Sequence, residues 1–357
     1  MPVSVVATGD FLPQRPPGDP VGALLRAGDI AFVNLEGPLT DADAPADTVA
    51  WVRGERRLAA ELRAAGVAVA TLANNHAADF GTAGLLDTVA ALGEAGVQVV
   101  GAGHDLEHAL RPQVVSTDGP SIAFLGLAST LPNGCAAGER RPGIAPVRVV
   151  SRFVIDPVVL DQNPGMAPYV ETLAREQDVA GACAAVAAAK QRADVVVVGI
   201  HWGVPVGWAP SFQSELADYQ QPLAHALIDA GADAIVGHHP HVLHGIEVYD
   251  GRPIFYSLGN FLFHLLVSGE LELTRPYPAY DFTSLRARLG GLARLHWSEP
   301  GPPERVELAI VGLDEAGDPE PAAPEQAAAA VAQVNELSRR FGVRLDGGGD
   351  WLRVQAP

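Results

Sequence analysis

The sequence has very little cysteine and almost no lysine, and these shortages exclude several classes of protein. Of the 357 residues only two are cysteine, Cys135 and Cys183, which is too few for a disulfide framework or a thiolate metal site. Lysine occurs once, at Lys190, and no G-x-x-x-x-G-K-S/T loop exists, so a P-loop ligase driven by ATP is not indicated. Any clamp for a phosphate or carboxylate must use arginine, for example Arg53, Arg56 or Arg275.

Positive charge and long apolar runs are also scarce. The 24 basic residues face 42 acidic ones, giving a formal charge of −18, which argues against nucleic acid or an anionic membrane as a partner. No run of 18 apolar residues occurs, and the N-terminus lacks the pattern of a signal peptide. From these two absences we expect a soluble, cytoplasmic protein. Hydrophobic residues still make up 48% of the chain, which predicts a sizeable core. Its oligomeric state is left open.

Short β-branched runs alternate with helical segments along the chain. This alternation predicts β-α-β units whose strands are buried between helices. Asp250-Gly251 separates two alternating runs, which is a hairpin signal. We expect the strands in this later part of the chain to pair antiparallel. The expected strands lie in 3–8, 30–35, 67–72, 97–101, 121–128, 193–203, 232–241, 246–258, 291–297 and 305–314, and the expected helices are 54–66, 82–96, 215–231 and 325–341.

These elements predict a single α/β domain in which two mixed β-sheets pack face to face with helices outside. We expect the domain to cover residues 1–314, with loop-like insertions at about 140–168 and 265–282. The first insertion is rich in proline and arginine and is expected to be irregular. Residues 315–357 are expected to form a Pro-rich linker and a C-terminal helix and tail that pack on the domain.

Five polar clusters fall at or just after the ends of predicted strands. Because sites in α/β folds collect at the carboxyl ends of strands, we expect the clusters to meet at one edge. In His239-Pro-His241 the two rings can lie on one side of an extended backbone, and neutral imidazole is the commonest metal ligand. Mixed nitrogen and oxygen ligands suit Mn²⁺, Fe²⁺, Zn²⁺ or Co²⁺ better than Ca²⁺. The clusters contain Asp10; Asn34 and Glu36; Asn74, Asn75, His76 and Asp79; His201; and His238, His239 and His241.

Several of these residues also have a structural alternative. Asp10 could cap a turn, and Glu36 could be a helix N-cap or the buried partner of an arginine. Asn74 and Asn75 could be turn residues, because asparagine tolerates left-handed backbone geometry. His201 could be a core histidine. The histidines outside the clusters are assigned structural roles: His104, His108, His225, His264 and His296.

Six segments, taken in order, resemble the signature blocks of the bacterial capsule-synthesis CapA family, which is associated with poly-γ-glutamate. They are "GD", "NLEGPLT", "LANNHAADFG", "HWG", "GADAIVGHHPHV" and "YSLGNFLF", over roughly residues 4–263. That family is similar in turn to the calcineurin-like metallophosphoesterases, so the resemblance implies their four-layer sandwich and one or two divalent transition ions. The ligands it implies are Asp10, Glu36, Asn75, His201, His239 and His241.

Neighbouring residues are candidates for acid–base and substrate contacts. By the same resemblance His76 matches the residue that usually contacts the leaving group, and His238 is a second candidate acid or base. We also expect Asn74, Trp202 and Asn260 to contact the substrate. For Trp202 the alternative is packing, and for Asn260 it is support of the site.

Three kinds of function fit this pattern. The first is a metal-dependent enzyme that hydrolyses or transfers at an amide (γ-glutamyl-like) or phosphoester bond, with a metal-activated water or electrophile and a histidine acid. The second is a biosynthetic enzyme that uses the metal to condense or rearrange a small metabolite. The third is a non-catalytic assembly factor for an acidic polymer. We favour the first, although Leu12 stands where the superfamily usually has a histidine ligand.

Overall fold

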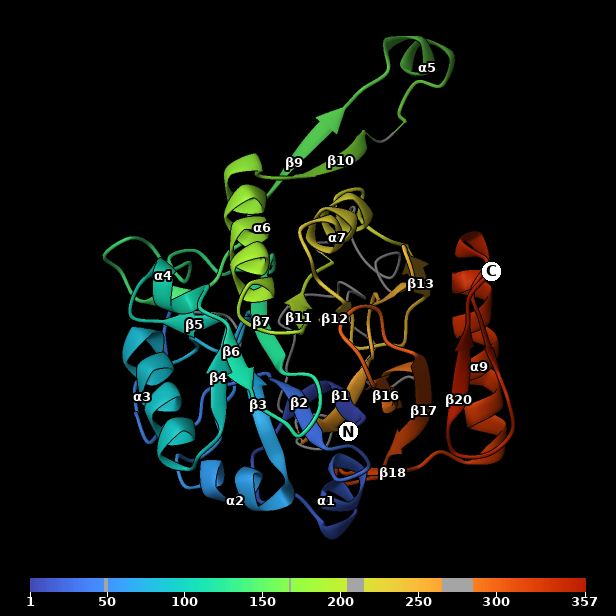
Figure 1. Ribbon diagram of the computed structural model, residues 1–357. Helices are drawn as coiled ribbons and strands as arrows, with labels where there is room; N and C mark the ends of the chain where they lie inside the picture. The colour runs from blue at the N-terminus through green and yellow to red at the C-terminus, as the bar shows by residue number, and fades with distance from the viewer. Residues whose placement is uncertain (48–50, 167, 204–214, 265–284) are drawn as a thin grey trace.

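Two mixed β-sheets stack face to face in the computed structural model, and helices cover both outer surfaces (Figure 1). This α/β architecture confirms the fold predicted from the sequence and is consistent with a calcineurin-like sandwich. The structure describes residues 1–47, 51–166, 168–203, 215–264 and 285–357. The expected insertion at 265–282 and Arg275 lie outside these ranges.

The larger sheet has a parallel centre and antiparallel additions. Strands β1 (Val3–Leu12), β2 (Ile30–Leu35), β3 (Val67–Thr71) and β4 (Gln98–Val100) run parallel, and β16 (Leu289–Trp297) pairs antiparallel with β1. The order is β19-β20-β17-β16-β1-β2-β3-β4, with β15 on β1 and β18 on β17. The added strands are β15 (Asn260–Phe263), β17 (Arg305–Leu313), β18 (Pro319–Pro321), β19 (Arg344–Asp346) and β20 (Leu352–Gln355).

The smaller sheet has the order β13-β14-β12-β11-β7-β6. Its four inner strands are parallel, whereas β6 and β13 pair antiparallel at the two edges. The hairpin predicted at Asp250-Gly251 is the β13–β14 connection. The strands are β6 (Gln113–Val115), β7 (Ile122–Ala128), β11 (Val195–His201), β12 (Ala234–His238), β13 (Ile246–Tyr249) and β14 (Arg252–Phe255).

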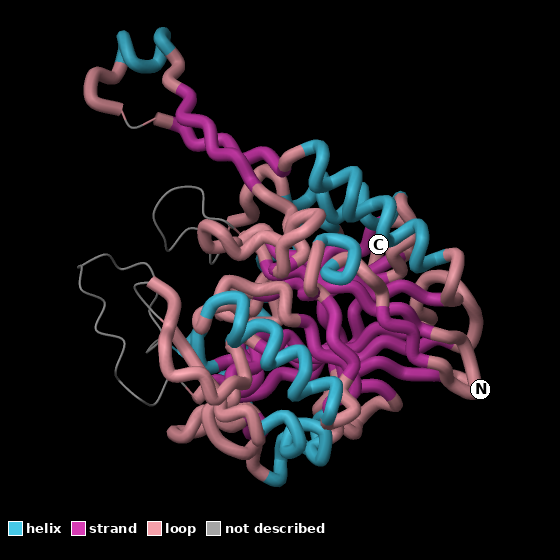
Figure 2. The backbone as a smooth tube through the Cα atoms, turned by 90° about the vertical axis from the view of Figure 1, so that its left-hand side faces the viewer, coloured by secondary structure: helices cyan, strands magenta, loops and turns pink. Residues whose placement is uncertain are grey.

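Helices complete the outer layers (Figures 1 and 2). Three of them pack on the outer face of the larger sheet: α1 (Asp19–Leu25), α2 (Leu58–Ala65) and α3 (Gly81–Glu94). Two pack on the smaller sheet: α6 (Glu176–Lys190) and α7 (Gln220–Asp229). The C-terminal helix α9 (Pro324–Ser338) packs against the apolar layer between the sheets. Within the described ranges, no helix is long and apolar enough to cross a bilayer.

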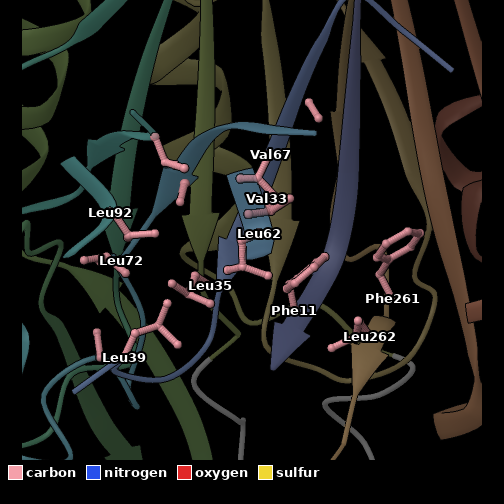
Figure 3. Packing of buried hydrophobic residues seen from close by; sticks show 14 of the residues in the cluster. Phe11, Val33, Leu35, Leu39, Leu62, Val67, Leu72, Leu92, Phe261 and Leu262 are labelled. Carbon is pink, nitrogen blue, oxygen red and sulfur yellow. The ribbon is translucent and has the colours of Figure 1, made fainter. Parts of the chain in front are cut away.

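Strands that are buried on both faces explain the continuous apolar runs in the sequence. In β1, Val5 and Ala7 face the other sheet, whereas Val6 between them faces the outer helices. In β11, Val197 faces the larger sheet and Val198 faces α6 and α7. Figure 3 shows the layer under the outer helices, where Phe11 and Phe261 stack with ring centroids 5.9 Å apart.

Part of the segment expected to be an irregular insertion is regular. Strands β9 (Val149–Val154) and β10 (Tyr169–Ala174) form a two-stranded antiparallel ribbon, and α5 (Pro157–Gln162) lies at its far end. We call residues 149–166 and 168–174 the apical arm, because they project from the body beyond α6 (Figures 1 and 2). The prolines and arginines of this segment suggest an irregular loop, whereas its β-branched residues pair across the ribbon.

The C-terminal residues are integrated more closely than a linker and tail would be. Strand β18 lies within the expected Pro-rich linker and pairs with β17, and β20 also pairs with β17. The final helix is confirmed as α9, followed by a 3-10 turn at Arg339–Phe341. A domain boundary at residue 314 stays a prediction.

Candidate metal centre

The polar clusters meet at one edge of the sandwich, as the sequence predicts. Strands β1, β2 and β3 run parallel in one sheet, and β11 and β12 run parallel in the other, so that their carboxyl ends deliver side chains to a common region. Adjacent strands place partners directly beside each other: Asp10 pairs with Asn34, and His201 pairs with His238. The side chains that gather there are Asp10, Glu36, Asn75, His201, His239 and His241.

The first of two overlapping groups that could hold a metal ion contains Glu36, His201 and His239. His201 Nε2 lies 3.2 Å from His239 Nδ1 and 3.4 Å from Glu36 Oε1. The Asn75 side-chain oxygen lies 2.7 Å from the same His201 nitrogen. Two ligands bound at about 2.1 Å to one tetrahedral ion would be separated by about 3.4 Å, so these spacings suit a shared cation.

The second group contains Asp10, Glu36 and His241. His241 Nε2 lies 3.7 Å from Glu36 Oε1, and His241 Nδ1 lies 3.3 Å from Asp10 Oδ2. Leu12 contributes no ligand here, because it is buried in a small apolar cluster with Val52 and other hydrophobic residues. The second group is therefore poorer in nitrogen donors than the first.

Glu36 is the acid that both groups share. Its side chain is fully buried, and neither carboxylate oxygen has a hydrogen-bond partner among the described residues. Burial raises the pKa of this carboxyl, opposed by the charges of His241 and His76. Burial and repulsion from Glu36 also hold the pKa of Asp10 well above its ordinary value. Two buried carboxyls whose negative charge is so disfavoured fit a site that receives a cation.

The imidazoles of the first group are held in their neutral form. Burial, followed by repulsion from neighbouring histidines, keeps the pKa of His201 and of His239 well below the ordinary value. A histidine must be neutral to bind a metal. These two rings are therefore in the protonation state that a ligand needs near neutral pH.

The turn that carries His239 and His241 is not the extended segment that the sequence suggested. His239 has a φ of 101° and His241 a φ of 55°, and such positive values are uncommon for residues other than glycine. As a result the two rings belong to different groups, His239 beside His201 and His241 beside Asp10. Backbone strain of this kind concentrates at functional sites.

Asparagines hold the candidate ligands in place. The Asn34 side-chain amide donates to Asp10 Oδ1 at 2.8 Å and lies 3.2 Å from His201 Nδ1. Asn260 Oδ1 lies 2.9 Å from His241 Nδ1, and its amide nitrogen donates to the Ala287 carbonyl at 2.9 Å. Asn260 is thus placed to support a ligand, which was the alternative to substrate contact. The sequence marked Asn34 as part of a cluster without predicting this role.

Asn74 is a turn residue in the structure, which was the alternative to substrate contact. It is fully buried, its amide nitrogen donates to the Leu35 carbonyl at 2.8 Å, and its oxygen accepts from the backbone of His76 and Ala77. With these atoms engaged inside the protein, Asn74 shapes the turn after β3. These engaged polar atoms are not available to a substrate.

Trp202 is packed in the interior, which was the alternative to substrate contact. Its indole has no exposed surface, stacks on Tyr256, and donates from Nε1 to the Tyr256 carbonyl at 2.9 Å. A substrate would find no free face of this ring. Among the described residues, Trp202 therefore packs in the buried apolar cluster that includes Tyr256.

His76 and His238 take different positions. His76 is partly exposed, and its Nδ1 lies 2.8 Å from Asp79 Oδ2, an oxygen that also accepts from the Val52 amide. Burial would lower the pKa of His76, but the hydrogen bond and charge of Asp79 outweigh it and raise that pKa. His238 is buried, bonds the Thr8 carbonyl through Nε2 at 3.0 Å, and has a pKa lowered by burial to about 4. That position links two strands, so we do not propose His238 as an acid.

The remaining histidines with acidic partners lie outside the centre. His225 contacts Glu247, His264 contacts Asp318, and the other two pairs are His108 with Asp105 and His296 with Glu307. These contacts match the structural roles expected for them. His104 packs edge-on against His108.

The fold and this centre define a class: an α/β sandwich with buried carboxylates, an amide and three imidazoles at the carboxyl ends of its strands. Residues 5–265 match the family described as "Bacterial capsule synthesis protein PGA_cap". The chain belongs to this family. The match covers all the candidate ligands and ends before the C-terminal strands and α9.

Individual relatives agree with this assignment. The chain is 35% identical over 246 residues to the "PGA biosynthesis protein CapA" of Bacillus subtilis, covering 68% of this chain and 55% of that one. It is 32% identical over 247 residues to the "Capsule biosynthesis protein CapA" of Bacillus anthracis, covering 68% and 52%. A "Probable polyglutamine synthesis accessory protein" of Mycobacterium tuberculosis is 35% identical over 240 residues, covering 66% and 55%. The chain therefore spans about half the length of these relatives.

Proposed function

We propose that this chain is a metal-dependent enzyme that hydrolyses or transfers at an amide bond of the γ-glutamyl type or at a phosphoester bond. The observation that carries the proposal is the buried Glu36 carboxylate, whose oxygens lack hydrogen-bond donors in the described residues while imidazole nitrogens lie 3.4 and 3.7 Å away. Such an arrangement costs free energy unless a cation offsets it. A divalent transition ion suits the mixed nitrogen and oxygen donors.

Asn75, His201, His239 and Glu36 would hold the ion that keeps its full ligand set, and Asp10, His241 and Glu36 would hold a second. A bound divalent ion supplies electrophilic polarisation of a carbonyl or phosphoryl oxygen and a water of lowered pKa. The chain itself supplies burial that excludes bulk water around Glu36. It also orients two candidate ligands: the Asn34 amide donates to Asp10, and the Asn260 oxygen accepts from His241 Nδ1.

His76 is the residue we assign to proton transfer. Asp79 holds its Nδ1 at 2.8 Å, which leaves Nε2 as the nitrogen available to a substrate. With Nδ1–H donated to Asp79, the imidazole carries its second proton at Nε2 and can release it to a departing group. The partial exposure of His76 matches this role, because the candidate ligands other than Asn75 are almost fully buried.

Arg53 is the arginine that we expect to bind an acidic substrate. Of the two arginine candidates that the structure describes, Arg56 is paired with Asp87 and Glu94, whereas Arg53 is exposed and has no acidic partner in the described ranges. Arg53 lies over the Phe80 ring, and Trp51 meets the same ring edge-on. The intervening Val52 amide donates to the Asp79 oxygen that holds His76. A substrate carboxylate bound by Arg53, near the proposed acid His76, agrees with the capsule and polyglutamine names of the relatives.

Metal analysis and turnover by matched variants test the proposal. Protein purified without chelator is expected to contain a transition metal and to cleave a γ-glutamyl anilide or an aryl phosphoester. His239→Ala should lose most of the metal and the activity. His76→Ala should keep the metal and lose turnover by about 10²–10⁴-fold, whereas His296→Ala, paired with Glu307 away from the centre, should change neither. Bound metal with no turnover on either substrate would favour the non-catalytic assembly factor.

A further inference from the structure

The apical arm carries most of the exposed large apolar side chains in the described parts of the chain. Across the described residues eleven large apolar side chains are exposed, and eight of these eleven lie on the arm. The other three, Met1, Trp51 and Leu285, are scattered along the sequence. Single exposed hydrophobic residues are normal, but a contiguous apolar patch marks a site of interaction. The most exposed members on the arm are Phe153 at 73%, Val158 at 65%, Ile155 at 56% and Met166 at 50%.

The arm cannot cover this surface by itself. Strands β9 and β10 form a separate two-stranded sheet, and α5 has no buried residue. An isolated two-stranded ribbon is only marginally stable in water. The body holds the base of the arm, where Arg148 forms an ion pair with Asp178 and the Thr172 amide donates to Asp218 at 3.0 Å. The outer half projects into solvent (Figures 1 and 2).

The two edges of the ribbon differ. Because the Thr172 amide donates to Asp218, the outer edge of β10 is occupied at its base. Thr172 is opposite Ser151 in the register, and in antiparallel pairs the backbone groups alternate between inward and outward. Ser151 and Phe153 therefore direct their backbone groups to the outer edge of β9, which pairs with no other strand of the described residues. An open edge of this kind is a template for another strand.

We propose that a second copy of this chain covers the arm, with the two β9 strands paired antiparallel across a twofold axis at Phe153. This pairing joins the two ribbons into a four-stranded sheet and uses the same surface of both copies, as a twofold interface requires. It sets Phe153 opposite its own copy and Val154 opposite Arg152 of the other. Aromatic pairs directly opposite each other stabilise antiparallel strands.

The size of the surface suits a copy of the same chain. Counted over both faces of the ribbon and α5, the eight exposed residues present on the order of 700 Å², the same order as the approximately 800 Å² per partner of a standard interface. A bilayer is the less favourable cover, because Asp156 and Asp161 lie among the apolar residues and the chain carries a formal charge of −18. Asp156 caps α5 by accepting from the Val158 amide.

Sedimentation equilibrium and a cross-link test the pairing. The wild-type chain is expected to be a dimer at micromolar concentration. The double variant Phe153→Ser and Val158→Ser should raise the dimer dissociation constant by at least about tenfold, with unchanged thermal unfolding of the monomer because both side chains are exposed. The control Trp51→Ser removes an exposed apolar residue outside the arm and should leave the dimer intact.

Phe153→Cys places two thiols on the proposed axis and should give a reducible covalent dimer. Glu299→Cys, exposed on the body, should not; both variants keep Cys135 and Cys183. A wild-type chain that is monomeric throughout, or a dimer that the double variant leaves unchanged, would overturn the proposal. Loss of the dimer without a Phe153→Cys cross-link would overturn the β9 pairing. Monomers that bind anionic phosphatidylglycerol vesicles through Phe153 would assign the arm to a membrane instead.

Discussion

Replacing Glu36 by glutamine should have opposite consequences in the absence and in the presence of metal. The substitution keeps the size of the side chain and removes the negative charge. In protein treated with chelator, the buried carboxylate has no hydrogen-bond donor in the described structure and its pKa is raised. A raised carboxyl pKa means that the charged form costs stability above that pKa, and that the cost disappears as the pH falls below about 4.3, the ordinary value. Glu36→Gln should therefore raise the free energy of unfolding of metal-free protein at neutral pH by about 1 kcal/mol.

The sign reverses when metal is added. A ligand at 100 times its dissociation constant stabilises the native state by about 2.7 kcal/mol, which corresponds to roughly 4 °C in melting temperature for a chain of this size. Glu36 belongs to both groups that could hold an ion. If its loss weakens binding by about a hundredfold, the same metal concentration stabilises the variant by only about 0.4 kcal/mol.

Thermal unfolding with chelator and with added Mn²⁺, Fe²⁺, Co²⁺ or Zn²⁺ measures both effects. Glu247→Gln is the matched control, because Glu247 is a buried carboxylate that accepts from Tyr256 and contacts His225 at 2.8 Å. Its free energy of unfolding should fall by about 1.5–3 kcal/mol under both conditions. Its melting temperature should still rise fully when metal is added. Equal metal-induced shifts in wild type and Glu36→Gln would refute the assignment of Glu36 as a shared ligand.

Three further substitutions probe contacts around the centre and the arm. Asn260→Ala removes the partner of His241 Nδ1 and should weaken metal binding by about 10–100-fold in a calorimetric titration; unchanged affinity would contradict the supporting role. Arg53→Gln should raise KM for a γ-glutamyl substrate by about tenfold with little change in kcat, whereas Arg57→Gln, an exposed arginine paired with Glu55, should leave KM unchanged. Burial would raise the pKa of Asp178, but hydrogen bonds from Arg148 and the charge of Arg175 lower it. The stability from this carboxylate is therefore present above about pH 3.9 and lost as the pH falls through the lowered value. The deficit of Asp178→Asn in urea unfolding should be about 2 kcal/mol at pH 7 and shrink in acid; a deficit independent of pH would contradict the ion pair.

The sheets, and the gathering of the candidate ligands at one edge, could be predicted because their signals are local. Buried strands such as Val3–Leu12 and Val195–His201 are apolar on both faces, so they stand out as continuous runs. The polar residues that follow them are delivered to one edge by the parallel pairing itself. The apical arm was missed because its strands are short and exposed, so that neither a buried run nor a clean alternation marks them.

Contacts between distant parts of the sequence could not be predicted. Asp79 was recognised only as a member of a cluster, yet it joins His76 to the backbone of Val52, which lies 27 residues away. Asn34 reaches His201 across 167 residues and from one sheet to the other. The residue types Asn74 and Trp202 suggested substrate contacts, but burial and internal hydrogen bonds use their polar atoms. Residue type indicates what a side chain can do, whereas its packing decides what remains available.

The His239-Pro-His241 turn shows the difference between what residue type predicts and what packing decides. The sequence predicts both histidines as ligands and suggests an extended backbone that would place their rings together. Both residues instead have positive φ values, and their ring centroids lie 6.0 Å apart in different ligand groups. Such conformations cost on the order of 1–3 kcal/mol each and persist only where surrounding contacts hold them. Here the contacts include the His239 amide donating to Asp10 and His241 bonding Asn260. The turn thus divides its two imidazoles between the two sides of Glu36, which an extended segment would not do.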